Sequence, residues 1–536
     1  MQLLYNARIY TLDPQQPQAS ALAIDQGRIL AVGDDDRMLA EFEGRGEKRN
    51  LEGHVVLPGL TDAHVHLRHY AFSLQKVNCE TRSLSECLER VAQRVARTPP
   101  GQWVLGHGWN QNEWPDVPVD RGVDGFPSAA LLDDIAPHHP VYLTAKSLHA
   151  AWANRAALRA AGIDANTPDP PGGAIQRGPH REPTGILLED AMHLVSRCIP
   201  QPTEEQTVQA IQEAQSMLWR MGLTGIHDFD RRTCFAALQI LHARGELGIR
   251  VIKSLPLEDL PHAIALGLRT GFGDDWLRIG LVKAFADGAL GPHTAAMLQP
   301  YEDEPDNRGM LLLDAEEILE HGRKAVTNGL GMVIHAIGDR ANHEVLDAYQ
   351  GLREYEREHG LPHFRHRIEH VQILHPEDFP RLKNLDVIAS MQPIHATSDM
   401  YAADRFWGTR AANAYAWRSL LELGTALAFG SDAPVESPNP FWGIHAAVTR
   451  QRADGNPGPD GWYPRQRLTR LQAIQGYTTG AAFAAGMEDR LGQLAPGFLA
   501  DLIVLPTDPF TCPAEEIRDI KPLATMVGGV WRGEIW

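Results

Sequence analysis

The chain has 536 residues, of which 43% are hydrophobic and 22% are charged, ordinary values for a globular protein. Its formal net charge of −18 argues against nucleic acid and anionic membrane surfaces as partners. No apolar stretch approaches the roughly 18 residues of a membrane span, and the first residues lack the basic and apolar regions of a signal peptide.

The cysteines are few, scattered and odd in number, and none belongs to a CxxC pair: Cys79, Cys87, Cys198, Cys234 and Cys512. This pattern fits a reducing compartment and argues against a disulfide framework or a thiolate zinc site. We therefore expect a cytoplasmic protein.

Both ends of the chain have the texture of short strands separated by turns. The first 33 residues contain LLYNARIYTL and ALAIDQGRILAVG, and the last residues contain LADLIVL and LATMVGGVW. Apolar runs bounded by Gly, Pro and Asp turns are typical of β-strands. The sequence therefore predicts one small β-sandwich domain built from residues 1–57 and 485–536.

The centre of the chain alternates short apolar runs with helical patterns. Segment 204–222 is typical of the helices, with Val208, Ile211 and Leu218 at helical spacing. Strands that are buried on both faces read as continuous apolar runs. Eight such runs occur, at 55–66, 222–229, 249–255, 277–288, 331–339, 365–372, 387–393 and 425–434. Eight is the number of strands in a closed (β/α)8 TIM-type barrel, which we place at residues 58–484.

A long stretch interrupts this rhythm after the first run. Residues 68–205 contain helical pieces and loops rich in Pro and Gly. They form a large insertion after barrel strand 1. Since loops that follow barrel strands lie on the catalytic face, we expect the insertion to act as a lid over the active site.

Side chains that bind metals stand at the ends of several of these runs. His64 and His66 form an H-x-H pair, and residues i and i+2 of a strand point to the same face. His335, His370 and Asp432 end three later runs. Histidine and carboxylate ligands suit Zn, Mn or Fe, so the pattern predicts a site for a divalent metal at the mouth of the barrel.

Lys283 lies inside LRIGLVKAF, an apolar strand that we expect to be buried. Burial of an ammonium group is costly and lowers its pKa. A neutral amine can react with carbon dioxide to form an anionic carbamate, which can bridge two cations. The alternative is an ion pair with a buried carboxylate such as Asp287.

At this point the sequence resembles a known family. PGLTDAHVHL has the first-strand form of the amidohydrolase superfamily, and LVKAFADGALG, VIHAIGDRA, IEHVQ and FGSDAPV resemble later-strand motifs of one branch. That branch includes the N-substituted formamide deformylases. LHAAWANRAAL and GHGWNQNEWP resemble its inserted region, and GFLADLIVL resembles the C-terminal sandwich segment. The resemblance covers essentially the whole chain.

The resemblance implies a role for each candidate ligand. His64, His66 and Asp432 would bind the more buried metal, His335 and His370 a second one, and a carboxylated Lys283 would bridge the two. We therefore predict an enzyme, a metal-dependent amidohydrolase that cleaves a non-peptide C–N bond in an amide, N-formyl amine or N-acyl amine. Metal-activated hydroxide would attack the carbonyl, and Asp432 would act as general base and then general acid.

Three other functions remain open. A deaminase shares the metal core, but Ala336, Ile337 and Gly338 follow His335 where deaminases of the superfamily often carry a Glu, leaving Asp339 as a substitute. A lactone or ester hydrolase, including a phosphotriesterase, uses the same core. The third alternative is a metal-binding scaffold protein without turnover.

The substrate is a small molecule that the sequence does not identify, and the expected assembly is a homodimer. Substrate contacts are predicted from position alone: Trp109, Asn110 and His149 in the insertion, and His293 and Arg308 after the Lys283 strand. Aromatic side chains often line such pockets, although Trp109 and Trp114 would equally pack the lid. Their number favours an apolar or aromatic group in the substrate.

Overall fold

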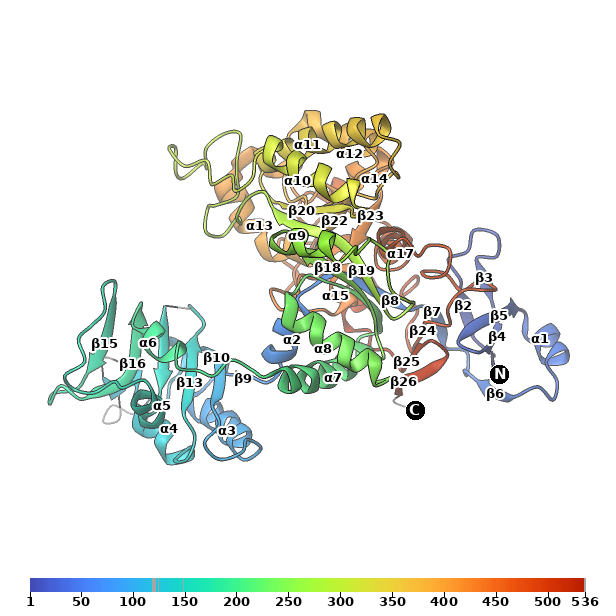
Figure 1. Cartoon of the computed structure of the whole chain (residues 1–536). Helices are drawn as coiled ribbons and strands as arrows, with labels where there is room; N and C mark the ends of the chain where they lie inside the picture. The colour runs from blue at the N-terminus through green and yellow to red at the C-terminus, as the bar shows by residue number, and fades with distance from the viewer. Residues whose placement is uncertain (118–121, 124, 148, 535–536) are drawn as a thin grey trace. The chain divides into compact units, whose positions relative to one another are not determined.

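The computed structural model describes residues 1–117, 122–123, 125–147 and 149–534. The chain divides into two compact units, Met1–Tyr70 with Thr207–Trp536, and Ala71–Gln206, and each is described by itself (Figure 1). The proposed domain boundaries stay predictions. In the part of the chain that the structure describes, no helix combines the length and the apolar character needed to cross a membrane.

The first unit contains an eight-stranded sheet that is nearly closed into a barrel. Neighbouring strands pair in parallel and follow chain order, and a bridge between Val65 and Ala433 joins the last strand to the first. This confirms the predicted (β/α)8 barrel. The strands are β8 (Leu60–Val65), β17 (Leu223–Asp228), β18 (Arg250–Pro256), β19 (Leu277–Phe285), β20 (Met332–Ala336), β21 (Arg367–His370), β22 (Ile388–Met391) and β23 (Leu427–Phe429).

Helices connect the barrel strands. In α7 (Glu204–Arg220) the predicted apolar residues Val208, Ile211 and Leu218 are buried, and α10 (Ala315–Thr327) begins with a capping box between Asp314 and Glu317. The other helices of the unit are α1 (Asp35–Glu41), α2 (Leu67–Ser73), α8 (Arg232–Ala243), α9 (Leu260–Ala265), α11 (Asp339–Glu358), α12 (Phe379–Asn384), α13 (Pro393–Trp407), α14 (Trp417–Glu422), α15 (Pro440–Thr449), α16 (Arg470–Gly476) and α17 (Thr479–Ala485).

The two chain ends form the predicted pair of sheets. One has the order β5-β4-β1-β6 and the other β26-β25-β24-β7-β2-β3, and one apolar core containing Leu4, Ile24, Val56 and Val504 joins residues of both. Their strands are β1 (Gln2–Tyr5), β2 (Arg8–Tyr10), β3 (Gln18–Ala19), β4 (Ala21–Asp25), β5 (Arg28–Gly33), β6 (Glu47–Asn50), β7 (Val55–Pro58), β24 (Leu502–Leu505), β25 (Ala524–Val527) and β26 (Val530–Glu534).

The apolar run 55–66 is therefore two strands rather than one. Its first half, β7, pairs antiparallel with β24 in the terminal sheet, and its second half, β8, pairs with β17 in the barrel. Gly59 separates them where a Cβ would collide with the Thr224 side chain. Residues packed on both faces look alike in sequence whichever sheet they join, so the run did not reveal the break.

The second unit contains most of the predicted insertion. It has a six-stranded sheet of order β15-β16-β14-β13-β10-β9 and a two-stranded sheet of β11 and β12. The elements are β9 (Val77–Asn78), β10 (Val104–Trp109), β11 (Gly122–Val123), β12 (Phe126–Pro127), β13 (Val141–Ala145), β14 (Ala150–Ala153), β15 (Gly173–Arg177), β16 (Pro183–Glu189), α3 (Leu84–Val95), α4 (Ala129–Ile135), α5 (Arg155–Ala160) and α6 (Met192–Ser196). Its expected role as a lid stays a prediction.

Candidate metal centre

The six residues predicted to bind metal lie at or near the carboxyl ends of barrel strands. They are His64 in β8 and His66 just beyond it, Lys283 in β19, His335 in β20, His370 in β21 and Asp432 after β23. Because parallel strands in a closed barrel all finish at the same face, residues distant in sequence can gather there.

Three of these residues converge closely. His64, His370 and Asp432 each offer a ligand atom, these atoms lie within 4.8 Å of one another, and all three side chains are buried. The distance from His64 Nε2 to Asp432 Oδ1 is 3.4 Å. His66 Nε2 lies 3.4 Å from the same oxygen. One carboxylate oxygen therefore faces both histidines of the H-x-H pair.

His335 lies beside this cluster but faces partly away from it. Its ring centroid is 4.5 Å from that of His370. Its Nε2 donates to the carbonyl oxygen of Gly288 at 2.9 Å and lies 3.5 Å from Asp287 Oδ1. The structure thus places His335 next to the cluster without bringing its Nε2 into it.

Lys283 is buried, and no hydrogen-bond partner for its Nζ is found among the described residues. The Nζ lies 4.9 Å from the ring centroid of Phe229 and 4.8 Å from that of Phe285. Asp287 forms no ion pair with it; its carboxylate accepts hydrogen bonds from the backbone of Ala296, Ile337 and Gly338 instead. An unpartnered buried amine beside histidine and carboxylate donors fits a site that receives a further group.

Burial lowers the pKa of Lys283 and of three of the histidines, whereas Asp230 and Asp432 outweigh burial at His66 and raise its pKa to about 9. Burial lowers the pKa of Lys283 to about 8, against the opposing charges of Glu369 and Asp432. Burial lowers the pKa of His335 to about 3 and moves the pKa of His64 and His370 below the ordinary value. Neutral imidazoles keep a lone pair for a cation, so these histidines are in the form that binds metal.

Two buried polar side chains contact the Nδ1 atoms of His64 and His370. Glu369 Oε2 lies 2.5 Å from His64 Nδ1, and Gln392 Oε1 lies 2.9 Å from His370 Nδ1. Each contact engages one ring nitrogen and leaves Nε2 for a ligand. Such partners fix the tautomer and orientation of metal-binding histidines.

His66 is held from the neighbouring strand. Asp230, two residues after β17, lies 3.3 Å from His66 Nδ1 and 2.5 Å from His69 Nδ1. His66, His69 and Asp230 also bring their ligand atoms within 4.8 Å of one another. His69, however, is 60% exposed, and the short contact to Asp230 already satisfies its ring nitrogen. We interpret Asp230 as the residue that orients His66.

Asp62 ties the first barrel strand to the last. Its carboxylate accepts from the backbone N–H of His64 and of Ser431, each at 3.0 Å, and from the Ser431 hydroxyl at 2.5 Å. Burial raises the pKa of Asp62 to about 7. Gly430 permits this close approach, because a Cβ there would lie 2.5 Å from the His64 backbone nitrogen. Asp62 thereby sets the spacing between His64 and Asp432.

The backbone at the cluster is strained. His370 has φ 76°, Val371 φ 45° and Asp432 φ 60°, a region in which residues other than Gly cost of order 1–3 kcal/mol each. Such conformations persist only where surrounding contacts determine them. Here they turn the His370 and Asp432 side chains toward one another at the ends of their strands.

The predicted substrate contacts in the first unit have other partners. His293 Nδ1 lies 2.8 Å from Glu304 Oε1, and its ring stacks on Tyr301 with centroids 4.9 Å apart. Arg308 is exposed and donates to the carbonyl oxygen of Leu298. Both lie in the long connection between β19 and α10, and their contact with substrate stays a prediction.

The predicted contacts in the second unit are described within that unit. Trp109 is fully buried in its core and donates from Nε1 to the Leu143 carbonyl oxygen at 2.8 Å, so packing accounts for it. Asn110 caps a 3₁₀ turn at Gln111–Glu113. His149 is 70% exposed and lies 2.9 Å from Glu189. Their roles toward substrate stay predictions.

Several functional candidates escaped the sequence analysis. Glu369, Asp230 and Gln392 were not singled out. The sequence did contain a signal for Glu369. Arg367 and Glu369 are charged residues two apart in a strand that is buried on both faces, and buried charges require partners inside the protein. Arg367 pairs with Glu369. Asp339, considered as a deaminase base, accepts from the Leu298 backbone N–H at 2.8 Å.

An apolar cavity of about 600 Å³ adjoins the cluster. Its lining includes Leu257, Leu260 and Ile264 together with Lys283 and Phe285. The Phe285 ring also contacts the His335 ring, with centroids 5.2 Å apart. The cavity and the candidate metal centre therefore share Lys283, and Phe285 contacts both.

Comparison with known proteins gives matches along nearly the whole chain. Residues 47–531 match the amidohydrolase family. The chain is 35% identical to Protein LONG AFTER FAR-RED 3 of Arabidopsis thaliana, covering 98% of this chain and 90% of that protein. It is 32% identical to the putative amidohydrolase YtcJ of Bacillus subtilis, covering 97% of each chain.

Two further matches bear on activity and fold. The N-substituted formamide deformylase of Arthrobacter pascens is 28% identical over 99% of this chain and 98% of its own length. The crystal structure of an uncharacterized metal-dependent hydrolase from Pyrococcus furiosus has 31% identity and a TM-score of 0.76, covering 95% of this chain and 100% of that one.

Proposed function

We propose that this chain, which belongs to the amidohydrolase family of metal-dependent hydrolases, cleaves a non-peptide C–N bond in an amide, an N-formyl amine or an N-acyl amine. The observation that carries the proposal is the convergence of His64, His370 and Asp432 within 4.8 Å, beside the unpartnered amine of Lys283. Nitrogen and carboxylate donors in this arrangement suit Zn, with Mn and Fe as alternatives.

His64, His66, His335, His370 and Asp432 would hold the metal. When bound, a divalent metal lowers the pKa of a coordinated water toward 7 and polarises a carbonyl oxygen. Lys283 would join the ligands after carboxylation. The lone pair of its neutral Nζ bonds to the carbon of carbon dioxide and the nitrogen loses one proton, which gives a carbamate whose single negative charge is shared by two oxygens.

Asp432 is the proposed proton carrier. Its Oδ1 faces both His64 Nε2 and His66 Nε2 at 3.4 Å. This oxygen would therefore lie beside a nucleophilic water that a metal on these histidines holds. The carboxylate takes a proton from that water as general base and delivers it to the leaving nitrogen as general acid. Asp62 and Gly430 keep Asp432 at this distance from His64.

Two observations narrow the substrate. The relative named N-substituted formamide deformylase supports an N-formyl amine. The apolar cavity that touches Lys283 and Phe285 supports a substrate with an apolar substituent. We therefore favour an N-formyl or N-acyl amine with an apolar group on nitrogen.

The test combines metal analysis with a panel of reactions. Protein purified without chelator is expected to contain about two metal ions per chain if Lys283 is carboxylated, and to release amine from N-formyl and N-acetyl derivatives of apolar amines. Ammonia release from aminated heterocycles would instead identify a deaminase, and acid release from lactones an ester-type hydrolase. Protein that neither contains nor takes up Zn or Mn would refute the proposal.

Asp432→Asn separates an enzyme from a metal-binding scaffold. General-base catalysis contributes roughly 10²- to 10⁴-fold, so we expect a loss of that size in kcat with metal still bound. Asp306→Asn, at an exposed aspartate of the β19–α10 connection, serves as the matched control. A scaffold protein would have no activity for the substitution to remove.

A further inference from the structure

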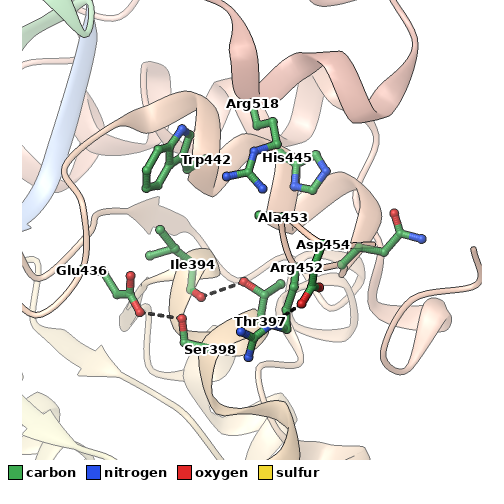
Figure 2. A pocket seen from close by; sticks show the side chains of 11 residues that line it. Ile394, Thr397, Ser398, Glu436, Trp442, His445, Arg452, Ala453, Asp454 and Arg518 are labelled. Carbon is green, nitrogen blue, oxygen red and sulfur yellow. Dashed lines mark hydrogen bonds and ion pairs between the residues drawn. The ribbon is translucent and has the colours of Figure 1, made fainter. Parts of the chain in front are cut away.

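A second cavity, of about 210 Å³, lies in the first unit near the connection that carries Asp432 (Figure 2). Its walls come from α13, from α15 and from the 3₁₀ segment Ala514–Asp519, and they include Glu436, four residues after Asp432. None of the predicted metal ligands lines it. It is therefore a separate place at which a small molecule can bind.

Arg518 supplies a positive charge to this cavity. Its guanidinium carbon lies 5.3 Å from the ring centroid of Trp442, and within the described residues no carboxylate forms an ion pair with it. Figure 2 shows the guanidinium group between Trp442 and His445. A half-buried guanidinium that contacts an aromatic ring but no carboxylate can still receive an anion.

His445 lines the cavity beside Arg518. It is only 5% exposed, and no hydrogen bond to its imidazole is found among residues that the structure describes. Burial and the neighbouring Arg518 charge lower its pKa to about 4, so the ring is neutral at neutral pH and offers one N–H donor. An imidazole that lines the cavity can donate this N–H to a bound molecule.

The remaining walls restrict the charge and shape of that ligand. Trp442 and Ile394 present apolar surface. Glu436 accepts from the Ser398 hydroxyl at 2.5 Å, and Asp454 lies 3.6 Å from Arg452 Nε. Arg452 is already paired with Asp454, so Arg518 is the guanidinium left for a ligand. Glu436 and Asp454 on the same walls disfavour a multiply charged anion, whereas a singly charged one can pair with Arg518.

We propose that this cavity binds a small monocarboxylate, with the carboxylate against Arg518 and His445 and an apolar body against Trp442. The planar guanidinium matches a carboxylate in two parallel hydrogen bonds. The inference is independent of the proposed hydrolysis, because it uses none of the metal-binding residues.

The experiment measures binding of 4-fluorobenzoate by fluorine NMR to the full-length protein, as purified and after removal of metal with a chelator. We expect saturable binding in both forms, because none of the predicted metal ligands lines this cavity. A probe held at the metal centre would instead be lost when the metal is removed. Inorganic phosphate is expected not to displace the probe. The proposal would be overturned if the probe no longer bound after metal removal, or if phosphate at the same concentration displaced it.

Two variants locate the site. Arg518→Gln is expected to weaken binding about tenfold or more, because it removes the charged donor of the two parallel hydrogen bonds. Ala453→Trp fills the cavity from an exposed position and should abolish binding without removing any internal contact. The matched control, Arg405→Gln, changes a 72% exposed arginine that pairs with Asp303. Unchanged binding in folded Ala453→Trp protein would refute the assignment.

Discussion

Glu369→Gln tests whether the carboxylate that contacts His64 Nδ1 governs metal binding. Glu369 is fully buried, its Oε2 lies 2.5 Å from His64 Nδ1, and it pairs with Arg367. Burial alone would raise the pKa of Glu369, but the Arg367 charge holds that pKa well below its ordinary value. The carboxylate is therefore ionised, and glutamine removes its charge while keeping its shape.

The expected losses of zinc affinity and of stability follow from the contacts of Glu369 with His64 and Arg367. Changing the partner of a metal-binding histidine typically weakens metal affinity 10- to 100-fold, which is about 1.4–2.7 kcal/mol. Leaving the buried Arg367 charge without its partner costs up to about 3–5 kcal/mol of stability. A typical domain has about 5–15 kcal/mol, so we expect the variant to fold with a lower denaturation midpoint.

The assay is zinc affinity by competition with a chelator, together with urea unfolding of the metal-free protein. Glu377→Gln, at an 86% exposed glutamate near β21, is the matched control. A merely structural role would lower stability and leave zinc affinity unchanged. Wild-type affinity in folded Glu369→Gln protein would therefore refute the reasoning.

Three other perturbations have defined outcomes. Lys283→Ala should lower the metal content from about two ions per chain to about one by elemental analysis, while Lys324→Ala, which is 55% exposed, should not; equal contents would remove the carbamate bridge. Gly430→Ala places a Cβ 2.5 Å from the His64 backbone nitrogen, so unfolding should show about 1–3 kcal/mol of lost stability from overpacking together with weaker zinc binding. The pKa of His445 is lowered to about 4, so the folded state binds fewer protons than the unfolded state below about pH 6.5, and stability falls as the pH drops through that window. Between pH 7 and pH 5 the free energy of urea unfolding should fall by about 2 kcal/mol more in the wild type than in His445→Gln.

The barrel was predictable because its strands leave a clear trace in the sequence. Buried parallel strands such as β20 and β22 read as mainly apolar runs, and histidines or a carboxylate stand at the ends of several. The boundary between β7 and β8 was not predictable, because Val55–Pro58 and Leu60–Val65 are both almost wholly buried, although in different sheets. Local pattern records burial but not which partner strand provides it.

The partners of the ligands were harder to predict than the ligands themselves. His64 and Glu369 are 305 residues apart, and their contact depends on β21 lying across the barrel interior from β8. A histidine at a strand end is visible from spacing, since period 2 fixes the face toward which it points. The contact to Glu369 depends instead on barrel closure, and so does the contact between Asp62 and Ser431.

Substitutions that disturb the closure of the barrel should also disturb the metal centre. A closed ring of strands places His64 and Asp432, residues from its two ends, 3.4 Å apart, and Asp62 with Gly430 maintains that closure through backbone hydrogen bonds. A change at Gly430 or Asp62 acts on the distance between the ligands without altering any ligand. Metal affinity in this chain therefore depends on the closure of the barrel as directly as on the donors, and variants at the seam between β8 and β23 should lose metal before they lose the fold.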